Sequence, residues 1–289
     1  PDPGRDIRVG PPRDHNRNVG QRTPMGKPAA PPPLDLDRVA LFLDYDGTLV
    51  EIAPVPEAAL ADPELIELLT ALERRVDGAL ALVSGRPVAS LDGFLHPLRL
   101  ATAGLHGLDL RTSDGRRLMS EVPHAELDRV RAAFAAFARE RPGTMVEDKE
   151  RSVVLHFRQA PVHEAEAVAL GERLAGASGS TLRLLHGKMV VELLPAGVDK
   201  GRAIAALMDR PPFRDRVPVY VGDDVTDEAG FRVVNDRGGT SVKVGLEGDT
   251  AARFRLAGNR ELREWLRAML RGANTGPTAP DRDGRSPEA

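Results

Sequence analysis

One apolar run, and the acids that end it, constrain the fold more than any other part of the chain. The uninterrupted run Val39–Leu43 is typical of a fully buried strand. It ends in two carboxylates, Asp44 and Asp46, followed by Gly47. In an open α/β sheet, ligands bind at the carboxyl ends of the strands. The two acids repel each other there, so we expect a divalent cation such as Mg²⁺ to hold them together with a substrate phosphate. An ordinary Asp-Gly turn is the alternative.

The next segments predict a strand–helix–strand unit. A Pro at the first helical position and leucines at helical spacing predict a helix over residues 63–76. Residues 79–83 form a second apolar run, which ends in Ser84, Gly85 and Arg86. This order predicts a parallel sheet with polar residues at the strand ends. Ser84 is then a candidate phosphate ligand beside the first acids, or alternatively a helix cap.

A third strand is expected over residues 98–101, leading to His106, for which we expect a structural role. From about Leu108 the pattern changes to hairpins. The first hairpin is expected over residues 108–120, around an Asp-Gly turn. The further expected strands lie near residues 144–149, 152–158, 182–185 and 188–194, with helices around 127–137 and 167–174. We therefore predict an inserted α+β domain whose antiparallel sheet is covered by two helices on one face.

Alternation along these strands separates two kinds of side chain, because successive residues of a strand point to opposite faces. Val153, Leu155 and Phe157 share one face. If the helices cover that face, the other face collects five charged side chains: Glu147, Lys149, Arg158, Lys188 and Glu192. A solvated charged face is the ordinary outcome. A face that carries both signs can also bind a neutral polyhydroxyl ligand, whose hydroxyl groups donate and accept hydrogen bonds.

Two motifs follow the insertion. Lys200 stands at the expected start of a helix, where a cation opposes the macrodipole, so we expect it to meet an anion. A solvated Lys is the alternative. Residues 217–221 form another apolar run, which is followed by Asp223, Asp224 and Asp227. A helix cap explains one of these acids but not all of them.

Clustered acids, a Lys and a hydroxyl at one sheet edge suit phosphoryl transfer, whose catalysis is mostly positioning and charge stabilisation. An Asp can also attack phosphorus and form an aspartyl-phosphate.

Composition excludes several classes of protein. The chain has 289 residues, 41% of them hydrophobic, and a net charge of -3, which gives no sign of nucleic-acid or membrane binding. It has no Cys, hence no disulfide or thiol chemistry, and no apolar run near the roughly 18 residues that span a bilayer. We expect a cytoplasmic monomer. Residues 1–33 contain nine of the 24 prolines and no Phe, Trp or Tyr, and we expect this arm and residues 272–289 to be disordered.

Together these motifs resemble those of the haloacid dehalogenase superfamily of phosphohydrolases. The four matching segments are residues 44–48, Ser84, Lys200 and residues 222–227. More narrowly, the chain resembles the trehalose-6-phosphate phosphatase family over residues 38–270. The segments that carry this resemblance are residues 84–86, 146–149, 156–158, 187–192, 199–201 and 222–228. The chain has His156-Phe157-Arg158 where that family has His-Tyr-Arg. The Phe falls on the buried face, so we expect no effect on function.

The resemblance implies a Rossmann-like parallel-sheet core over residues 34–107 and 195–271, with the cap domain over 108–194. It implies Mg²⁺-dependent hydrolysis of trehalose 6-phosphate, with Asp44 as nucleophile and Asp46 as general acid, then base. The implied Mg²⁺ ligands are Asp44, the backbone carbonyl of Asp46, and Asp223, supported by Asp224 and Asp227. The implied phosphate ligands are Thr48, Ser84 and Lys200, with Gly85 and Arg86 also contacting substrate. The implied sugar contacts are Glu147, Lys149, Arg158, Lys188 and Glu192.

Three alternatives stay open. The first is a phosphatase of the same superfamily that acts on another sugar phosphate, such as a sucrose or mannosylglycerate phosphate. The second is a phosphomutase, in which the aspartyl-phosphate passes to a sugar instead of water. The third is a non-catalytic carbohydrate-binding protein on this fold. The set of Asp44, Asp46, Lys200 and Asp223 argues against the third, because binding alone does not need all of them.

Overall fold

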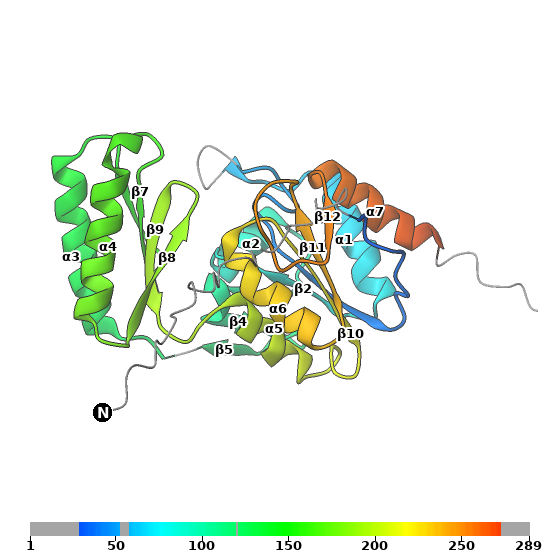
Figure 1. The fold of residues 1–289 in the computed structure, drawn as a ribbon. Coiled ribbons are helices and arrows are strands. Elements are labelled where there is room, and N and C mark those ends of the chain that lie inside the picture. Colours follow the sequence, from blue (N-terminus) through cyan, green and yellow to red (C-terminus); the bar gives the residue numbers. More distant parts are fainter. Residues whose placement is uncertain (1–28, 53–57, 120, 273–289) are drawn as a thin grey trace, which may run out of the picture.

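The computed structural model of the chain describes residues 29–52, 58–119 and 121–272, which form two sheets side by side (Figure 1). The larger sheet has eight strands in the order β12-β11-β10-β1-β2-β3-β4-β5, and the smaller has four in the order β6-β7-β9-β8. Residues 1–28 and 273–289, which belong to the two segments expected to be disordered, lie outside the described residues. Within the described part of the chain, no helix combines the length and apolarity that crossing a bilayer requires.

The large sheet is centred on the strand from which the sequence analysis began. Its strands are β1 (Val39–Leu43), β2 (Leu80–Val83), β3 (Ala101–Gly104), β4 (Asp109–Arg111), β5 (Arg117–Met119), β10 (Val217–Gly222), β11 (Thr240–Val244) and β12 (Phe254–Leu256). Strand β1 is buried along its whole length between β2 and β10, and both pairings are parallel. The predicted parallel-sheet α/β core is confirmed.

Helices cover both faces of this sheet. They are α1 (Pro63–Arg75), α2 (Val88–Phe94), α5 (Lys200–Met208), α6 (Glu228–Asp236) and α7 (Asn259–Gly272). The chain moves from β1 to β2 in one direction along the sheet, and from β10 to β11 in the other. Right-handed crossovers therefore put α1 and α6 on opposite faces. Helix α7 packs against α1, and α5 packs against α6. Because β1, β2, β3, β10, β11 and β12 run parallel, their carboxyl ends all lie at the same edge of the sheet.

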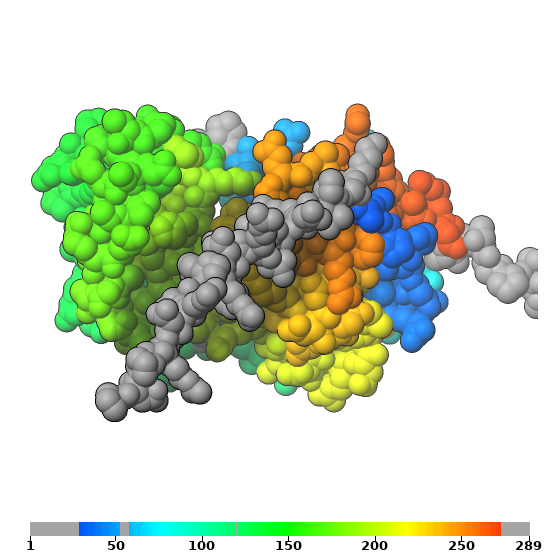
Figure 2. Space-filling view, viewed as in Figure 1, coloured from blue at the N-terminus to red at the C-terminus, as the bar shows by residue number. Residues whose placement is uncertain are grey.

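The small sheet forms a separate layer with two helices on its outer face (Figure 1). Its elements are α3 (His124–Glu140), β6 (Met145–Asp148), β7 (Val153–His156), α4 (Glu164–Ala177), β8 (Leu182–Gly187) and β9 (Val190–Pro195). We call residues 124–195 the cap and the other described residues the core. In the space-filling view the cap forms a lobe of its own at the left (Figure 2).

The predicted alternation is confirmed in the cap. Val153, Leu155 and Phe157 are buried against the helices, together with Val191 and Leu193 of β9. Phe157 is 1% exposed, in agreement with its expected place on the buried face. The opposite face of the sheet, which carries the charged residues, is turned toward the core (Figure 1).

The first hairpin was placed wrongly. Its strands β4 and β5 extend the large sheet, because β4 pairs antiparallel with β3. The Arg111 guanidinium fixes this pairing by donating to both carboxylate oxygens of Asp92 in α2, at 2.6 and 2.7 Å, and to the Leu100 carbonyl. Turn residues predict that a hairpin forms, but long-range contacts of this kind decide which sheet it joins. The third strand also begins at Ala101, three residues later than expected.

Part of the expected disordered arm is ordered. Pro31 is buried, and the Ala29 carbonyl accepts a hydrogen bond of 3.2 Å from the Arg255 amide. Trp265 of α7 donates its indole N–H to the Pro32 carbonyl at 3.4 Å. A proline residue lacks the backbone N–H donor but keeps its carbonyl acceptor, so a proline-rich segment can still be held by hydrogen bonds from its neighbours.

Candidate active site

A cavity of about 990 Å³ lies between the carboxyl ends of the core strands and the charged face of the cap. Most of the predicted site residues meet in its lining. Those from the core are Asp44, Asp46, Ser84, Gly85, Arg86, Lys200, Asp223 and Asp224, and those from the cap are Glu147, Lys149, Arg158, Lys188 and Glu192. Thr48 and Asp227 are not in the lining. Both are fully buried and contact Asp223 from behind.

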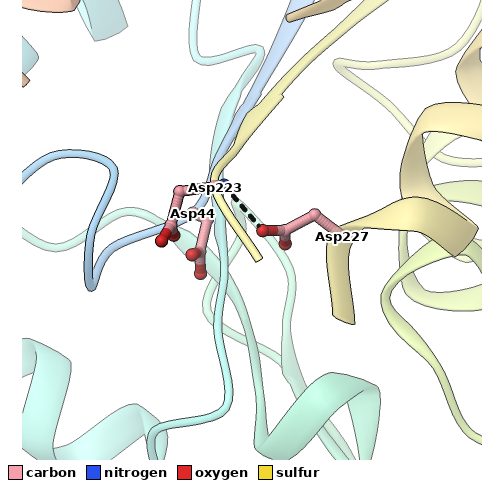
Figure 3. Close-up of side chains that lie close together, drawn as sticks. All are labelled: Asp44, Asp223 and Asp227. Atoms are coloured by element: carbon pink, nitrogen blue, oxygen red, sulfur yellow. Dashed lines mark hydrogen bonds between the residues drawn. The ribbon is translucent and has the colours of Figure 1, made fainter. Parts of the chain in front are cut away.

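Three acids, Asp44, Asp223 and Asp227, lie close together (Figure 3), and the first two of them line the cavity. Asp44 follows β1, Asp223 follows β10, and Asp227 lies in the short turn before α6. Each offers a carboxylate oxygen within 4.8 Å of the others. All the donors are oxygens, which is the set that hard divalent cations prefer. The side chains of Asp46 and Asp224, also predicted at the metal, are not in this cluster.

The carboxylate of Asp227 is already saturated with hydrogen bonds. Its Oδ1 accepts from Lys200 Nζ at 2.6 Å and from the Tyr220 hydroxyl, and its Oδ2 accepts from the amides of Asp223 and Asp224, both at 2.8 Å. Four donors use the roughly four acceptor positions of a carboxylate. Burial opposes ionisation, but the charge of Lys200 and the hydrogen bonds from Lys200, Tyr220 and the Asp224 amide together outweigh it and hold the pKa of Asp227 below its usual range. Asp227 therefore organises the turn, and Asp44 and Asp223 are the acids better placed to meet a cation.

Asp44 lies in a buried region with an excess of negative charge. It is 4% exposed, and Lys200 Nζ lies 2.9 Å from its Oδ1. Burial raises the pKa of Asp44 well above its usual value, and the charges of Asp227 and Asp223 add to this rise, which Lys200 only partly offsets. The pKa of Lys200 is raised despite burial, because Asp227 and Asp44 stabilise its charge. A further positive charge at Asp44 and Asp223 would relieve the repulsion.

Glycine lets the two strand ends approach each other. Gly47 has φ of +77°, and a Cβ at this position would lie 2.2 Å from Oδ2 of Asp223. Thr48, the next residue, donates its hydroxyl to Oδ1 of Asp223 at 3.2 Å. The predicted phosphate ligand thus supports an acid of the cluster.

Asp46 points to a different partner. The Arg86 guanidinium donates to both of its carboxylate oxygens, from Nε and from Nη2, each at 2.6 Å. The Ser84 hydroxyl oxygen accepts a hydrogen bond from the Arg86 amide at 3.2 Å, so the backbone of Arg86 is held at the end of β2. Arg86, which the sequence analysis assigned to substrate, contacts the expected general acid.

The cap wall is built around a buried carboxylate, Glu192. Ser152 donates to its Oε1 at 2.6 Å, and Lys149 Nζ and His106 Nε2 each lie 3.5 Å from its Oε2. Burial opposes ionisation, but Lys149 and the hydrogen bonds from His106 and Ser152 outweigh it, so that the pKa of Glu192 lies well below its usual value. Lys149 also donates to the Gly85 carbonyl at 3.1 Å, so the cap touches the core.

Three residues that contact the site, His156, Ser152 and Tyr220, were not predicted as part of it, and a fourth, His106, was expected only to have a structural role. His156 pairs with Glu147, with 2.8 Å between Nε2 and Oε2, and it lines the cavity. Alternation could have found it, because it shares a face with Arg158. His106 and Ser152 meet Glu192 from distant segments, and Tyr220 reaches Asp227 from inside an apolar strand. Alternation places Ser152 on the same face as His156 and Arg158, whereas the contacts of His106 and Tyr220 leave no pattern in the sequence.

Known proteins resemble this chain over most of its length. The model of the family described as trehalose-phosphatase matches residues 42–260. The trehalose-6-phosphate phosphatase of Escherichia coli (strain K12) is 41% identical over 229 residues, which is 79% of this chain and 85% of that protein. A probable trehalose-phosphate phosphatase of Sinorhizobium fredii is 42% identical over 211 residues, or 73% and 79% of the two chains.

Solved structures agree with the fold. A trehalose-6-phosphate phosphatase related protein superposes with a TM-score of 0.69 at 30% identity and covers 82% of this chain and 100% of that one. The C-terminal domain of a trehalose-6-phosphate phosphatase from C. albicans has a TM-score of 0.73 at 23% identity, covering 81% and 92%, and supports the fold alone. A haloacid dehalogenase-like hydrolase from Bacteroides thetaiotaomicron, at 13% identity and a TM-score of 0.61, does the same.

Proposed function

The chain belongs to the trehalose-phosphatase family, and from this premise we propose that it hydrolyses trehalose 6-phosphate to trehalose and phosphate, with Mg²⁺ and through an aspartyl-phosphate on Asp44. One observation carries the proposal for this chain. The buried acids with Lys200 and the mixed-charge face of the cap form opposite walls of a single cavity. One wall suits phosphate chemistry and the other suits a polyhydroxyl leaving group.

In the proposed first step, a carboxylate oxygen of Asp44 attacks phosphorus and the bond between phosphorus and the sugar oxygen breaks. Asp46, as a carboxylic acid, gives its proton to that oxygen, and trehalose leaves. In the second step Asp46 takes a proton from water, the water oxygen attacks phosphorus, and the bond to Asp44 breaks. Lys200, 2.9 Å from Asp44, offsets part of the negative charge that the phosphate adds.

The residues present fit a divalent cation. The carboxylates of Asp44 and Asp223 offer oxygen atoms that can bind a metal ion, and we propose the backbone carbonyl of Asp46 as a further ligand. When bound, Mg²⁺ would neutralise charge between the phosphate and the acids. Asp224 and Asp227 are proposed to support the turn, in agreement with the hydrogen bonds that Asp227 accepts.

Sugar recognition is proposed for the cap wall. Glu147 and Glu192 can accept hydrogen bonds from hydroxyl groups, and Lys149, Arg158 and Lys188 can donate them. We further propose that the cap, residues 124–195, is a domain inserted into the core and that its closure excludes water from the reacting phosphate. A monomeric state and a cytoplasmic location are part of the same proposal.

A panel of sugar phosphates tests the function, with phosphate release and product analysis as readouts. Purified protein in Mg²⁺ should release phosphate from trehalose 6-phosphate at a kcat/KM at least about tenfold above that for sucrose, glucose and mannosylglycerate phosphates. Preference for another member of the panel would contradict the substrate. An isomerised sugar phosphate without free phosphate would indicate a phosphomutase. Binding of trehalose without any turnover would indicate a non-catalytic binding protein. Dependence on Mg²⁺ is checked separately by chelation and add-back.

A further inference from the structure

We propose that Arg86 and Phe94 are positioning residues that hold the carboxyl group of Asp46 in place, with Phe94 acting through Arg86. The assignment rests on the proposed function, in which Asp46 transfers the proton. It replaces the expected role of Arg86 as a substrate contact, and it gives a role to Phe94, which the sequence analysis did not single out.

Arg86 binds the carboxylate of Asp46 through a bidentate contact. Nε and Nη2 of the guanidinium each lie 2.6 Å from a different carboxylate oxygen. A planar fork of this kind fixes the orientation of a carboxylate as well as its position. The side chain of Asp46 is 31% exposed, whereas that of Arg86 is 15% exposed. Without the fork, the exposed carboxylate would be free to turn toward water.

Phe94 fixes the plane of the guanidinium. The Arg86 Cζ atom lies 4.9 Å from the centroid of the Phe94 ring, within the range of a cation–π contact. Phe94 is itself held in place by a second aromatic ring. The Phe94 ring stacks on the ring of Tyr45, with 5.9 Å between centroids and 16° between planes. Tyr45 is fully buried and donates its hydroxyl to the Ala59 carbonyl at 2.7 Å.

Tyr45, Asp46, Arg86 and Phe94 form a closed set of contacts, which we call the circuit, because Tyr45 is the residue before Asp46 in the chain. The backbone of Asp46 is anchored by the buried ring of Tyr45. That ring supports Phe94, which supports Arg86, which returns to the carboxylate of Asp46. The Arg86 backbone is held as well, since its carbonyl accepts from the Leu105 amide at 3.0 Å. A proton-transferring group must stay within about 2.6–3.2 Å of the atom that it serves, and the circuit supplies that restraint.

The test uses substrates that differ in their need for a proton. A sugar leaving group needs protonation, whereas the acetate of acetyl phosphate leaves without it. Phe94→Leu keeps an apolar side chain but removes the aromatic face. We expect it to lower kcat on trehalose 6-phosphate by about three- to thirtyfold, with KM changed by less than about twofold. The kcat/KM on acetyl phosphate should stay within about twofold of wild type. Phe94→Tyr should restore most of the lost kcat, because it restores the ring.

A double-mutant cycle then asks whether Phe94 acts through Asp46. In an Asp46→Asn background, Phe94→Leu should have no further effect on the remaining turnover of trehalose 6-phosphate. Equal losses on both substrates, or a full effect in the Asp46→Asn background, would overturn the proposal. If Phe94→Leu does not fold, as judged by its melting curve, Arg86→Lys replaces it, since a Lys keeps the charge but cannot form the fork.

Failure of the proposed function has a different signature. If wild-type protein releases no phosphate from trehalose 6-phosphate but acts on another member of the sugar phosphate panel, the function is wrong in its substrate. The same variants are then measured on that sugar phosphate against acetyl phosphate. The positioning roles are overturned only if the two classes of substrate lose activity together.

Discussion

Lys188 of the cap forms an ion pair with Asp223 of the core, with 2.7 Å between Nζ and Oδ2. The Asp223 side chain is 6% exposed and that of Lys188 is 51% exposed, so a cap residue reaches one of the two acids proposed to meet the cation. Burial lowers the pKa of Lys188, but the hydrogen bond to Asp223 and the negative charges of Asp223, Asp224 and Asp227 together outweigh it and leave that pKa raised. The ammonium group of Lys188 and the proposed divalent cation would therefore compete for the same carboxylate.

Lys188→Met should strengthen cation binding. Half-exposed ion pairs contribute up to about 1 kcal/mol, so removing the competing ammonium should raise the affinity for Mg²⁺ by about two- to fivefold in calorimetric titration. Lys149→Met is the matched control, because Lys149 pairs with Glu192 and not with the acid cluster. Weaker Mg²⁺ binding in Lys188→Met would show that Lys188 helps to assemble the cation site.

Asp44→Asn should separate chemistry from recognition. The amide can neither attack phosphorus nor hold a metal as a carboxylate does, so turnover of trehalose 6-phosphate should fall below detection. Trehalose affinity should stay within about twofold of wild type, because the cap wall is unchanged. The melting temperature in chelator should not fall, since the variant removes a buried charge whose neighbours Asp227 and Asp223 repel it. Measurable turnover would exclude Asp44 as the nucleophile.

Glu192→Ala should impair the sugar phosphate selectively. A hydrogen bond to a charged group contributes about 1.5–3 kcal/mol, so kcat/KM on trehalose 6-phosphate should fall by about ten- to a hundredfold. Slow hydrolysis of p-nitrophenyl phosphate, which lacks the sugar, should barely change. Equal loss on both substrates would mean that Glu192 does not read the sugar. Asp44→Asn serves as the reference that loses both activities.

The stabilising contribution of Glu192 should depend on pH. Its pKa in the folded protein is lowered from about 4.5, mainly by Lys149 and by the hydrogen bonds from His106 and Ser152, which outweigh burial. A lowered acid pKa means that the stabilisation is present above pH 4.5 and is lost as the pH falls through the folded value. At pH 5, Glu192→Gln should lower the free energy of unfolding by about 1–3 kcal/mol, because the partners are left unpaired.

This deficit should shrink between pH 5 and pH 3, as measured by denaturant unfolding at each pH. Glu172→Gln, on the exposed surface of α4, is the control and should change stability by less than about 0.5 kcal/mol at either pH. A Glu192→Gln deficit of the same size at pH 3 and pH 5 would show that the charge of Glu192 is not its source.

Residues 29–33 should contribute to stability. A chain that begins at Leu34 loses the bond between the Ala29 carbonyl and Arg255, as well as the buried Pro31. Compared with a chain that begins at Ala29, its melting temperature should be lower by about 2–4 °C, as expected for a loss near 1 kcal/mol in a protein of this size. Identical melting temperatures would mean that these contacts stabilise nothing.

Local patterns predicted the parts of the site that depend on backbone topology. Asp44 and Asp223 end apolar runs, so parallel pairing of β1 with β10 brings them to one sheet edge, where Lys200 joins them from the start of α5. Glu192 was placed correctly on its face because alternation is a property of any strand. The partner of Arg86 and the saturation of Asp227 were not predictable, because they depend on side-chain rotamers. The sheet that the first hairpin joins depends on the contact between Arg111 and Asp92, which are 19 residues apart.

The four donors to Asp227 all belong to the core, and so do the members of the circuit around Asp46. The mixed-charge wall, by contrast, lies on strands of the cap. On the proposed function, a lineage can therefore exchange cap residues other than Lys188, which pairs with Asp223, and acquire a new sugar specificity while the core residues stay unchanged. A protein engineer would accordingly randomise the charged face of the cap strands except at Lys188, leave the core unchanged, and select for release of phosphate from a new sugar.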